Sequence, residues 1–263
     1  MKAYPIYQVD AFTDKLFGGN PAAVCPLEAW LPTYIMQQLA MENNLSETAF
    51  FVQKEDVFEI RWFTPETEID LAGHPTLATA FVIFNVLKMA SDTIYFESKS
   101  GTLIVEKKDD LLVMNFPSRM PVKAEQIPAG LLNGFNVAPM EVWKSRDYLL
   151  IYPNEADILA LIPNFSQLNT VETLGIIVSA PGKQCDFVSR FFVPNSVIGE
   201  DPVTGSAHAT LIPYWHHKLN KNKMTAQQLS KRGGKLWCEM NHDRVSIAGK
   251  AVIYMKGEYY LSA

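Results

Sequence analysis

Three side chains in this sequence have the chemistry needed to move a proton, and each lies close to a turn of small residues. Glu47 stands between Ser46 and Thr48, directly ahead of the apolar run Ala49–Val52. A carboxylate at the start of a buried strand loses contact with water, which raises its pKa towards the range useful for proton transfer. The competing interpretation is an ordinary solvated Glu, since most Glu side chains are exposed.

The other two candidates are Asp201 and His74. Asp201 lies in an acidic turn, where it could hold a substrate amine or raise the pKa of a neighbouring acid by like-charge repulsion. Alternatively, it is a loop Asp that bonds the local backbone. His74 lies at the first turn of a predicted helix, where it could donate to a substrate oxygen or relay protons. Its alternative is a His packed beneath the loop that enters the helix.

The segment 198–211 contains the turn beside Asp201. It reads Ile-Gly-Glu-Asp-Pro-Val-Thr-Gly-Ser-Ala-His-Ala-Thr-Leu, and Gly205 and Ser206 lead from the acidic turn into an apolar run. A Gly/Ser turn that opens a helix presents unpaired backbone N–H groups at the positive end of the helix dipole. Such a turn can hold a carboxylate or another anion. The alternative is a plain helix start with Ser206 near the N-cap.

A similar segment occurs twice in the chain. Residues 61–65 read Arg-Trp-Phe-Thr-Pro and residues 190–194 read Arg-Phe-Phe-Val-Pro, an offset of 129 residues (190 − 61). In both copies an aromatic strand leads through an acidic loop and a Gly-containing turn into an apolar helix. Two copies predict two halves of similar structure, because a solenoid needs about three or more short repeats.

Composition limits the possible classes of protein. The chain has 263 residues, 48% of them hydrophobic and 19% charged, with a net charge of −5. This balance is typical of a globular protein with ample core material, and the absence of a Lys/Arg cluster argues against a nucleic-acid partner. The start lacks the apolar stretch of a signal peptide and no 18-residue apolar span occurs, so we expect a cytoplasmic protein with no membrane contact.

The cysteines and histidines do not predict a metal site. Cys25, Cys185 and Cys238 are odd in number and far apart, which is typical of reduced core thiols and not of disulfides or a zinc site. His216 and His217 have no spacing typical of metal ligands. Catalytic triads, Walker loops and GxGxxG motifs are absent as well, so we expect neither a metal nor a nucleotide cofactor.

Hydrophobic periodicity predicts a mixed α+β protein with many strands. The helix that follows Gly73 is apolar on every side from Leu77 to Leu87, so it must be surrounded, most simply by a curved sheet. We place a domain boundary in residues 116–121, which gives halves of 1–117 and 118–263, with the last strand free to return to the first half. The predicted strands are Ala3–Phe12, Ala22–Cys25, Thr48–Gln53, Phe58–Phe63, Ile94–Phe96, Leu103–Glu106, Leu111–Asn115, Glu141–Tyr152, Leu174–Ser179, Phe187–Val193, Lys235–Met240, Arg244–Ala248 and Ala251–Met255. Further helices are predicted from Leu31-Pro32 and at Glu155–Leu161, Ala207–Leu219 and, weakly, Ala226–Leu229.

Several motifs together give the sequence a specific resemblance. They are Gly-Asn-Pro-Ala-Ala-Val (19–24), Ser-Glu-Thr-Ala-Phe (46–50), Ala-Gly-His-Pro-Thr-Leu-Ala (72–78) and Glu-Asp-Pro-Val-Thr-Gly-Ser-Ala-His (200–208). In this order and across most of the chain, they resemble the PhzF-like isomerases of phenazine biosynthesis, within the diaminopimelate epimerase-like fold. The resemblance implies two similar α+β halves, each a β-barrel-like sheet rolled around a central helix, with the active site between them.

The resemblance also implies a role for individual residues. Glu47 would be the general acid/base, with His74 and Asp201 as its polar partners. Ser46, Gly73, Gly205 and Ser206 would line the substrate site, and Asn20 in the Gly-Asn-Pro turn would contribute to it. Members of the family are commonly homodimers and need no cofactor, so we expect a homodimer acting on a small carboxylate-bearing substrate.

The sequence departs from the wider superfamily in one informative way. Diaminopimelate epimerase and proline racemase resemble it in fold but use one cysteine at each of two turns. The corresponding places hold Ala72 or Gly73 and Pro202 or its neighbours, so two-cysteine racemisation is excluded. A single carboxylate can instead take a proton from one carbon and return it to another, which is isomerisation. The alternatives are an amino-acid epimerase without catalytic cysteines and a small-molecule binding protein that has lost turnover.

Overall fold

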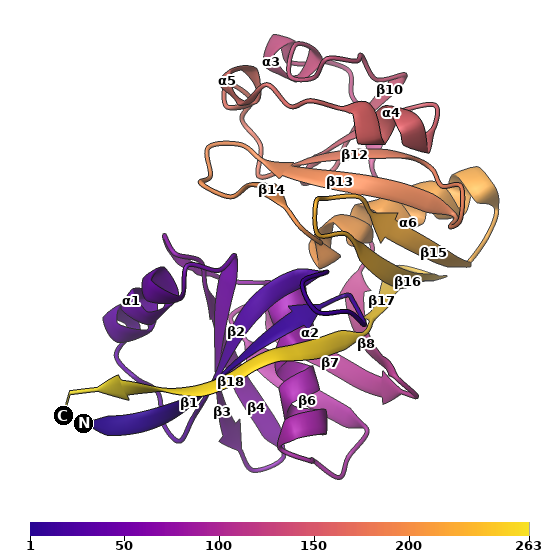
Figure 1. Cartoon of the computed structure of the whole chain (residues 1–263). Helices are drawn as coiled ribbons and strands as arrows, with labels where there is room; N and C mark the ends of the chain where they lie inside the picture. The colour runs from indigo at the N-terminus through magenta and orange to yellow at the C-terminus, as the bar shows by residue number, and fades with distance from the viewer. Residues whose placement is uncertain (263) are drawn as a thin grey trace. The chain divides into compact units, whose positions relative to one another are not determined.

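The computed structural model describes residues 1–262 and divides them into two compact units. Unit 1 comprises Met1–Asn115 together with the C-terminal segment from Ala248 onward, and unit 2 comprises Phe116–Ile247. The chain therefore crosses from one unit to the other twice (Figure 1). Most residues are in strands, with few helices, so the protein is a mixed α+β fold.

Unit 1 is built from a sheet with one helix on each face (Figure 1). Its strands are β1 (Lys2–Ala11), β2 (Asn20–Leu27), β3 (Glu47–Lys54), β4 (Val57–Phe63), β5 (Glu68–Ile69), β6 (Thr93–Ser98), β7 (Gly101–Lys108), β8 (Leu111–Pro117, which enters unit 2 at its end) and β18 (Ala251–Leu261). Its helices are α1 (Thr33–Asn43), α2 (Gly73–Phe81) and the π-helical turn η1 (Val82–Val86). Strands β2 and β3 run parallel, with α1 between them in sequence, and β4 returns antiparallel to β3.

Alternation along the strands decides which helix each side chain faces. Met36 and Ala40 of α1 pack on Cys25, Leu27, Phe50, Val52 and Phe63, which occupy every second position of β2, β3 and β4. Side chains at the positions between them face the opposite way, because the side-chain period of a strand is two residues. There α2 packs against β1, β2, β3 and β18, and all its residues from Gly73 to Ala80 are buried. The apolar helix thus packs against four strands, and its residues are buried as its composition predicts.

Unit 2 is likewise built from strands with helices on both faces. Its strands are β9 (Val122–Lys123), β10 (Glu141–Lys144), β11 (Tyr148–Ile151), β12 (Ile176–Pro181), β13 (Phe187–Val193), β14 (Gly199–Asp201), β15 (Lys223–Gln228), β16 (Gly234–Asn241) and β17 (Arg244–Gly249, which enters unit 1 at its end). Its helices are α3 (Ala129–Leu132), α4 (Glu155–Ala160), α5 (Phe165–Leu168) and α6 (Gly205–Leu219).

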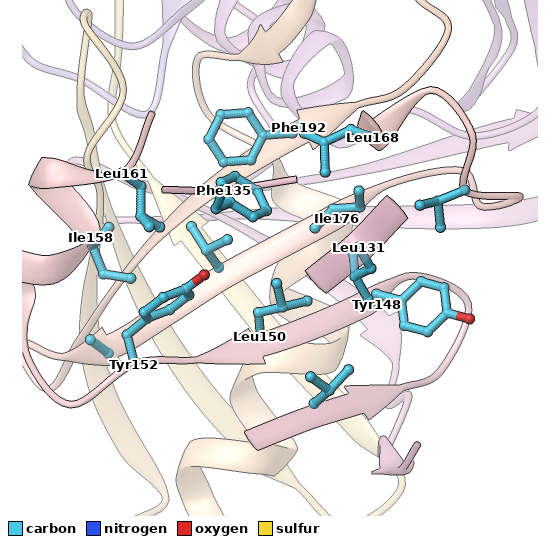
Figure 2. Close-up of a cluster of buried hydrophobic side chains, with 14 of the residues drawn as sticks. Leu131, Phe135, Tyr148, Leu150, Tyr152, Ile158, Leu161, Leu168, Ile176 and Phe192 are labelled. Carbon is cyan, nitrogen blue, oxygen red and sulfur yellow. The ribbon is translucent and has the colours of Figure 1, made fainter. Parts of the chain in front are cut away.

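The core of unit 2 has a layer on each side of the sheet. Leu131, Ile158 and Leu168, from α3, α4 and α5, pack on alternate residues of β11, β12 and β13 in one apolar cluster (Figure 2). On the other face, Trp215 of α6 stacks on Phe187 with ring centroids 5.7 Å apart and donates from Nε1 to Ser179 Oγ at 2.9 Å. The sheet is therefore covered by α3–α5 on one side and by α6 on the other.

Most predicted elements are present, and three are corrected. The helix predicted at Ala226–Leu229 is wrong, because residues 226–228 lie in β15, whose buried residues alternate and which pairs with β13 and β16. The strand predicted over Glu141–Tyr152 is two strands joined by a turn, β10 and β11. The helix predicted as far as Leu87 is α-helical only to Phe81 and continues as a π-helical turn.

Candidate active site

Glu47 is the first residue of β3, and alternation directs its side chain to the α2 face of the sheet. Phe50 and Val52 face α1, so Glu47, an odd number of positions away from both, faces the other helix. Its side chain is 16% exposed. A carboxylate is thus held at the edge of the apolar interior, with limited access to solvent.

His74 is the second residue of α2 and lies beside Glu47. Its Nε2 lies 3.2 Å from Oε2 of Glu47, and its side chain is 5% exposed. Burial lowers the pKa of His74 to about 3, an effect that a bond with the Pro21 backbone partly offsets, so the ring is neutral at pH 7. The two atoms are close but not aligned as a hydrogen bond. Catalytic pairs often reach good alignment only when substrate is bound.

Asn20 completes this cluster from β2. The residue is fully buried, and its Nδ2 lies 3.1 Å from Nδ1 of His74. The turn before it depends on Gly19, which has a φ of +60° and whose Cβ, if it had one, would lie 2.1 Å from the Ala11 carbonyl oxygen. The structure therefore brings Asn20, His74 and Glu47 together from three elements of unit 1.

Two further predicted residues flank this cluster. Ser46 precedes β3 in a bend and is half-buried, and Gly73 is the buried first residue of α2. The N-cap residue of α2, Ala72, makes no side-chain cap to the helix. Backbone N–H groups at the start of an uncapped helix can bind an anionic group.

In unit 2, Asp201 ends β14 and is tied to the start of α6. Its carboxylate accepts a hydrogen bond from Thr204 Oγ1, and its carbonyl accepts one from Gln228 Nε2 at 2.8 Å. Gln228 also accepts from the Thr204 backbone N–H at 2.9 Å. These hydrogen bonds fix Asp201 relative to the first turn of α6.

Gly205 and Ser206 are the first two residues of α6, and a guanidinium lies beside them. Arg146 Nη2 donates to Ser206 Oγ at 3.3 Å and to Asp147 Oδ2 at 2.7 Å. The Asp147 side chain is 1% exposed, so its charge is buried and paired with Arg146. Like Ala72 in α2, the N-cap residue Thr204 makes no side-chain cap. The start of α6 thus combines backbone N–H groups, a hydroxyl and a cation.

The sequence gives little indication of the roles of Arg146, Asp147 and Gln228. The only sequence signal for the first two is a charged pair between the segments that form β10 and β11. The residues around Gln228 do not predict its role. That role depends on the pairing of β15 with β13, which places Gln228 beside Asp201.

The three cysteines lie on other parts of the sheets. Cys25 on β2 and Cys238 on β16 are buried, Cys185 precedes β13 and is half-buried, and all three are free. Burial raises the pKa of each thiol, in Cys185 to about 11. Within residues 1–262, no three His, Cys, Asp or Glu side chains are grouped so that they could hold a metal ion. No helix in this range is long and apolar enough to cross a membrane.

The chain is similar to known proteins along nearly its whole length. The family model described as phenazine biosynthesis-like protein matches residues 9–257, nearly the whole sequence. The chain belongs to this phenazine biosynthesis-like family. It is 48% identical over 256 residues to an uncharacterized isomerase of Pseudomonas aeruginosa, an alignment that covers 97% of this chain and 98% of that protein.

Solved structures agree with this family membership. A phenazine biosynthesis PhzF-family protein from Enterococcus faecalis superposes with a TM-score of 0.96 at 47% identity, covering 99% of this chain and 100% of that one. A probable proline racemase from Agrobacterium radiobacter superposes with a TM-score of 0.66 at 7% identity, covering 98% and 93% of the two chains. This second likeness is one of fold alone.

Proposed function

We propose that this protein is a cofactor-independent isomerase in which Glu47 moves a proton on a small carboxylate-bearing substrate. The observation that carries the proposal is the 3.2 Å contact between Glu47 Oε2 and the neutral imidazole of His74. A half-buried carboxylate beside a neutral imidazole can accept a proton from carbon and return it elsewhere without releasing it to water. Relatives named as isomerases support the reaction class.

The partners of Glu47 have separate proposed tasks. His74 orients the Glu47 carboxylate and is close enough to exchange a proton with it. Asp201, fixed by Thr204 and Gln228, would bind a polar group of the substrate. Ser46 and Gly73 would contact the substrate from the start of α2.

The start of α6 supports a carboxylate as the group that anchors the substrate. Gly205 and Ser206 offer backbone N–H groups of a helix without a side-chain cap, and Arg146 adds a positive charge at the Ser206 hydroxyl. A helix N-terminus and a guanidinium both favour an anion. Reversing the charge with Arg146→Glu should therefore raise KM for a carboxylate substrate far more than it lowers kcat. We also propose a cytoplasmic homodimer, and light scattering after gel filtration would test the dimer.

The substrate class can be tested by proton NMR in deuterium oxide. Wild type and Glu47→Gln are incubated with a panel of small amino and hydroxy acids that includes an amino- and hydroxy-substituted cyclohexadiene acid. We expect wild type to move a double bond or incorporate deuterium at carbon, and Glu47→Gln to do neither. Equal rates in both proteins would contradict a role for Glu47. Inversion at a single carbon would indicate an epimerase, and line broadening without reaction would favour a binding protein.

A further inference from the structure

Both ring nitrogens of His74 have neighbours, and these neighbours differ in what they can donate or accept. Nδ1 lies 3.1 Å from the side-chain nitrogen of Asn20, and Nε2 lies 3.2 Å from a carboxylate oxygen of Glu47. The ring is neutral, because its burial disfavours the charged form. A neutral imidazole carries one proton, so one nitrogen must donate and the other must accept.

The neighbours together select one tautomer. An amide nitrogen can only donate, so it requires a lone pair on Nδ1, and a carboxylate can only accept, so it requires a proton on Nε2. The two requirements agree. We propose that Asn20 is a positioning residue that holds His74 in the tautomer with its Nε2–H towards Glu47.

The competing arrangement is equally well defined. The ring also bonds the backbone of Pro21, which can only be the carbonyl because proline has no N–H. If the Asn20 amide were rotated by half a turn, its oxygen would face Nδ1 and could accept a proton from it, and the lone pair of Nε2 would face the lone pairs of Glu47. That arrangement satisfies the Nδ1 end at the expense of the Nε2 end. The proposed tautomer gives the Asn20 amide a lone pair to donate to and directs Nε2–H towards Oε2 of Glu47, across a 3.2 Å contact that is not aligned as a hydrogen bond.

The backbone around Asn20 is suited to a positioning role. Asn20 begins β2 in register with Ala11 of β1, and the Gly19 turn before it tolerates no side chain. The loop between the two strands is fastened by the buried Asp10, which accepts from the Phe17 backbone N–H at 2.9 Å. A side chain on such a support keeps its orientation, which a residue acting through another must do.

Unit 2 contains an internal reference for the measurement. His208 on α6 is fully buried, and its Nδ1 lies 2.9 Å from the Thr204 carbonyl oxygen, which can only accept. His208 is therefore expected in the opposite tautomer, with the proton on Nδ1. One spectrum of the wild-type protein can then show both tautomers side by side.

The test is a long-range ¹H–¹⁵N correlation spectrum of the ¹⁵N-labelled protein at pH 7 without substrate. We expect a protonated Nε2 in His74 and a protonated Nδ1 in His208. In Asn20→Asp the amide donor becomes an acceptor, so we expect the proton of His74 to move to Nδ1. A His74 proton on Nδ1 in wild type, or on Nε2 in folded Asn20→Asp, would overturn the proposal.

Two further variants keep the result interpretable. Ser145→Ala removes a side-chain bond to Thr210 in unit 2 and should leave the His74 signals unchanged. Asn20→Ser replaces Asn20→Asp if the buried carboxylate prevents folding, and should give a mixture of tautomers. The wild-type spectrum decides the assignment without any variant.

The consequence for catalysis rests on the proposed function. Asn20→Asp should lower kcat by about 10- to 100-fold with KM changed less than about threefold, since a wrong tautomer impairs the reaction more than binding. The two claims can fail separately, because the tautomer is measured without substrate. The expected tautomers with full activity in Glu47→Gln would reject the proton shuttle and keep the role of Asn20.

Discussion

Units 1 and 2 repeat the same order of strands and helices. In unit 1, β1 pairs antiparallel with β2, a helix leads to the parallel strand β3, and β4 returns beside a short strand, β5, before the long apolar helix α2. Unit 2 follows the same path through β10, β11, α4, β12, β13, β14 and α6. After the long helix, β6 pairs parallel with β4, as β15 does with β13.

A matched ion pair lets the two units be aligned residue by residue. Arg61 binds both oxygens of Glu68 at 2.7 and 2.8 Å, and Arg190 binds both oxygens of Glu200 at 2.7 and 2.9 Å. Strand pairing extends this match, because Phe63 pairs with Glu68 as Phe192 pairs with Glu200.

Strand pairing extends this residue alignment to the neighbouring strands and shows which side chains differ between the units. Thr48 pairs with Phe63 and Ile176 pairs with Phe192, so the residues before them, Glu47 and Gly175, are equivalent. Unit 2 thus has a glycine where unit 1 has its proposed acid/base. The equivalent of Asn20 is Ser145, which bonds Thr210 and not a histidine.

The difference indicates a division of work on one scaffold. Unit 1 has a carboxylate, a neutral histidine and an amide in contact, a set suited to proton transfer. Unit 2 has Arg146 beside a helix start and Asp201 held by a hydrogen bond from Gln228, a set suited to binding. In the proposed function, the corresponding helix starts take part in proton transfer in unit 1 and in substrate recognition in unit 2.

The largest difference between the units should appear when His74 and His208 are each replaced by asparagine. We expect His74→Asn to lower kcat by about 10²- to 10⁴-fold, the usual cost of removing a group that acts in proton transfer. His208 begins the motif His-Ala-Thr-Leu, which repeats the His-Pro-Thr-Leu that begins at His74. The substitution His208→Asn should keep kcat within about threefold. Steady-state kinetics on folded variants decides the matter, and equal losses would contradict the division of work.

A smaller effect should show that unit 2 has no room for a side chain at Gly175, the position equivalent to Glu47. A Cβ on Gly175 would lie 2.1 Å from the ring of Phe191. Gly175→Ala should therefore cost about 1–3 kcal/mol of folding free energy through overpacking. Gly257→Ala is the control, since its Cβ would meet nothing closer than Ile6 Cγ2 at 3.8 Å. Urea unfolding that finds both variants equally stable would contradict this account.

An effect of similar size is expected on stability at acid pH. Burial lowers the pKa of His208 to about 4 from an ordinary value of 6.5. Between these pH values the unfolded chain binds a proton there that the folded chain does not, so stability falls as pH falls. The slope is about 1.4 kcal/mol per pH unit for this group, and His208→Asn should remove that part of it. If the unfolding free energies of wild type and His208→Asn fell in parallel from pH 7 to 5, this prediction would be contradicted.

Local patterns predicted much of the fold, and long-range pairing decided the rest. The strand predicted at Phe187–Val193 is β13 with the same ends, and the predicted apolar helix is α6 extended by two residues. The sequence of β15 was too polar to be distinguished from a helix, since four of its six residues are polar: Lys223, Thr225, Gln227 and Gln228. Its strand conformation depends on pairing with β13 and β16.

The candidate site follows the same rule. Glu47 could be named as a candidate from its own neighbours, but only the resemblance to the PhzF-like isomerases singled it out as the acid/base, because most Glu side chains are simply solvated. The contact between Asn20 and His74 spans 54 positions in the chain and depends on the register of β2 beside β3 and α2. Arg146 and the buried Asp147 depend likewise on the turn between β10 and β11 meeting α6.

The most direct test of the account is the turnover of Glu47→Gln with whichever acid the deuterium NMR panel identifies as substrate. Glutamine keeps the shape of the side chain but cannot accept the proton. We predict a loss in kcat of at least about 10³-fold, with ligand binding by NMR titration weakened less than about fivefold. A Glu47→Gln protein that retains more than about a tenth of the wild-type kcat would show that another group carries the proton.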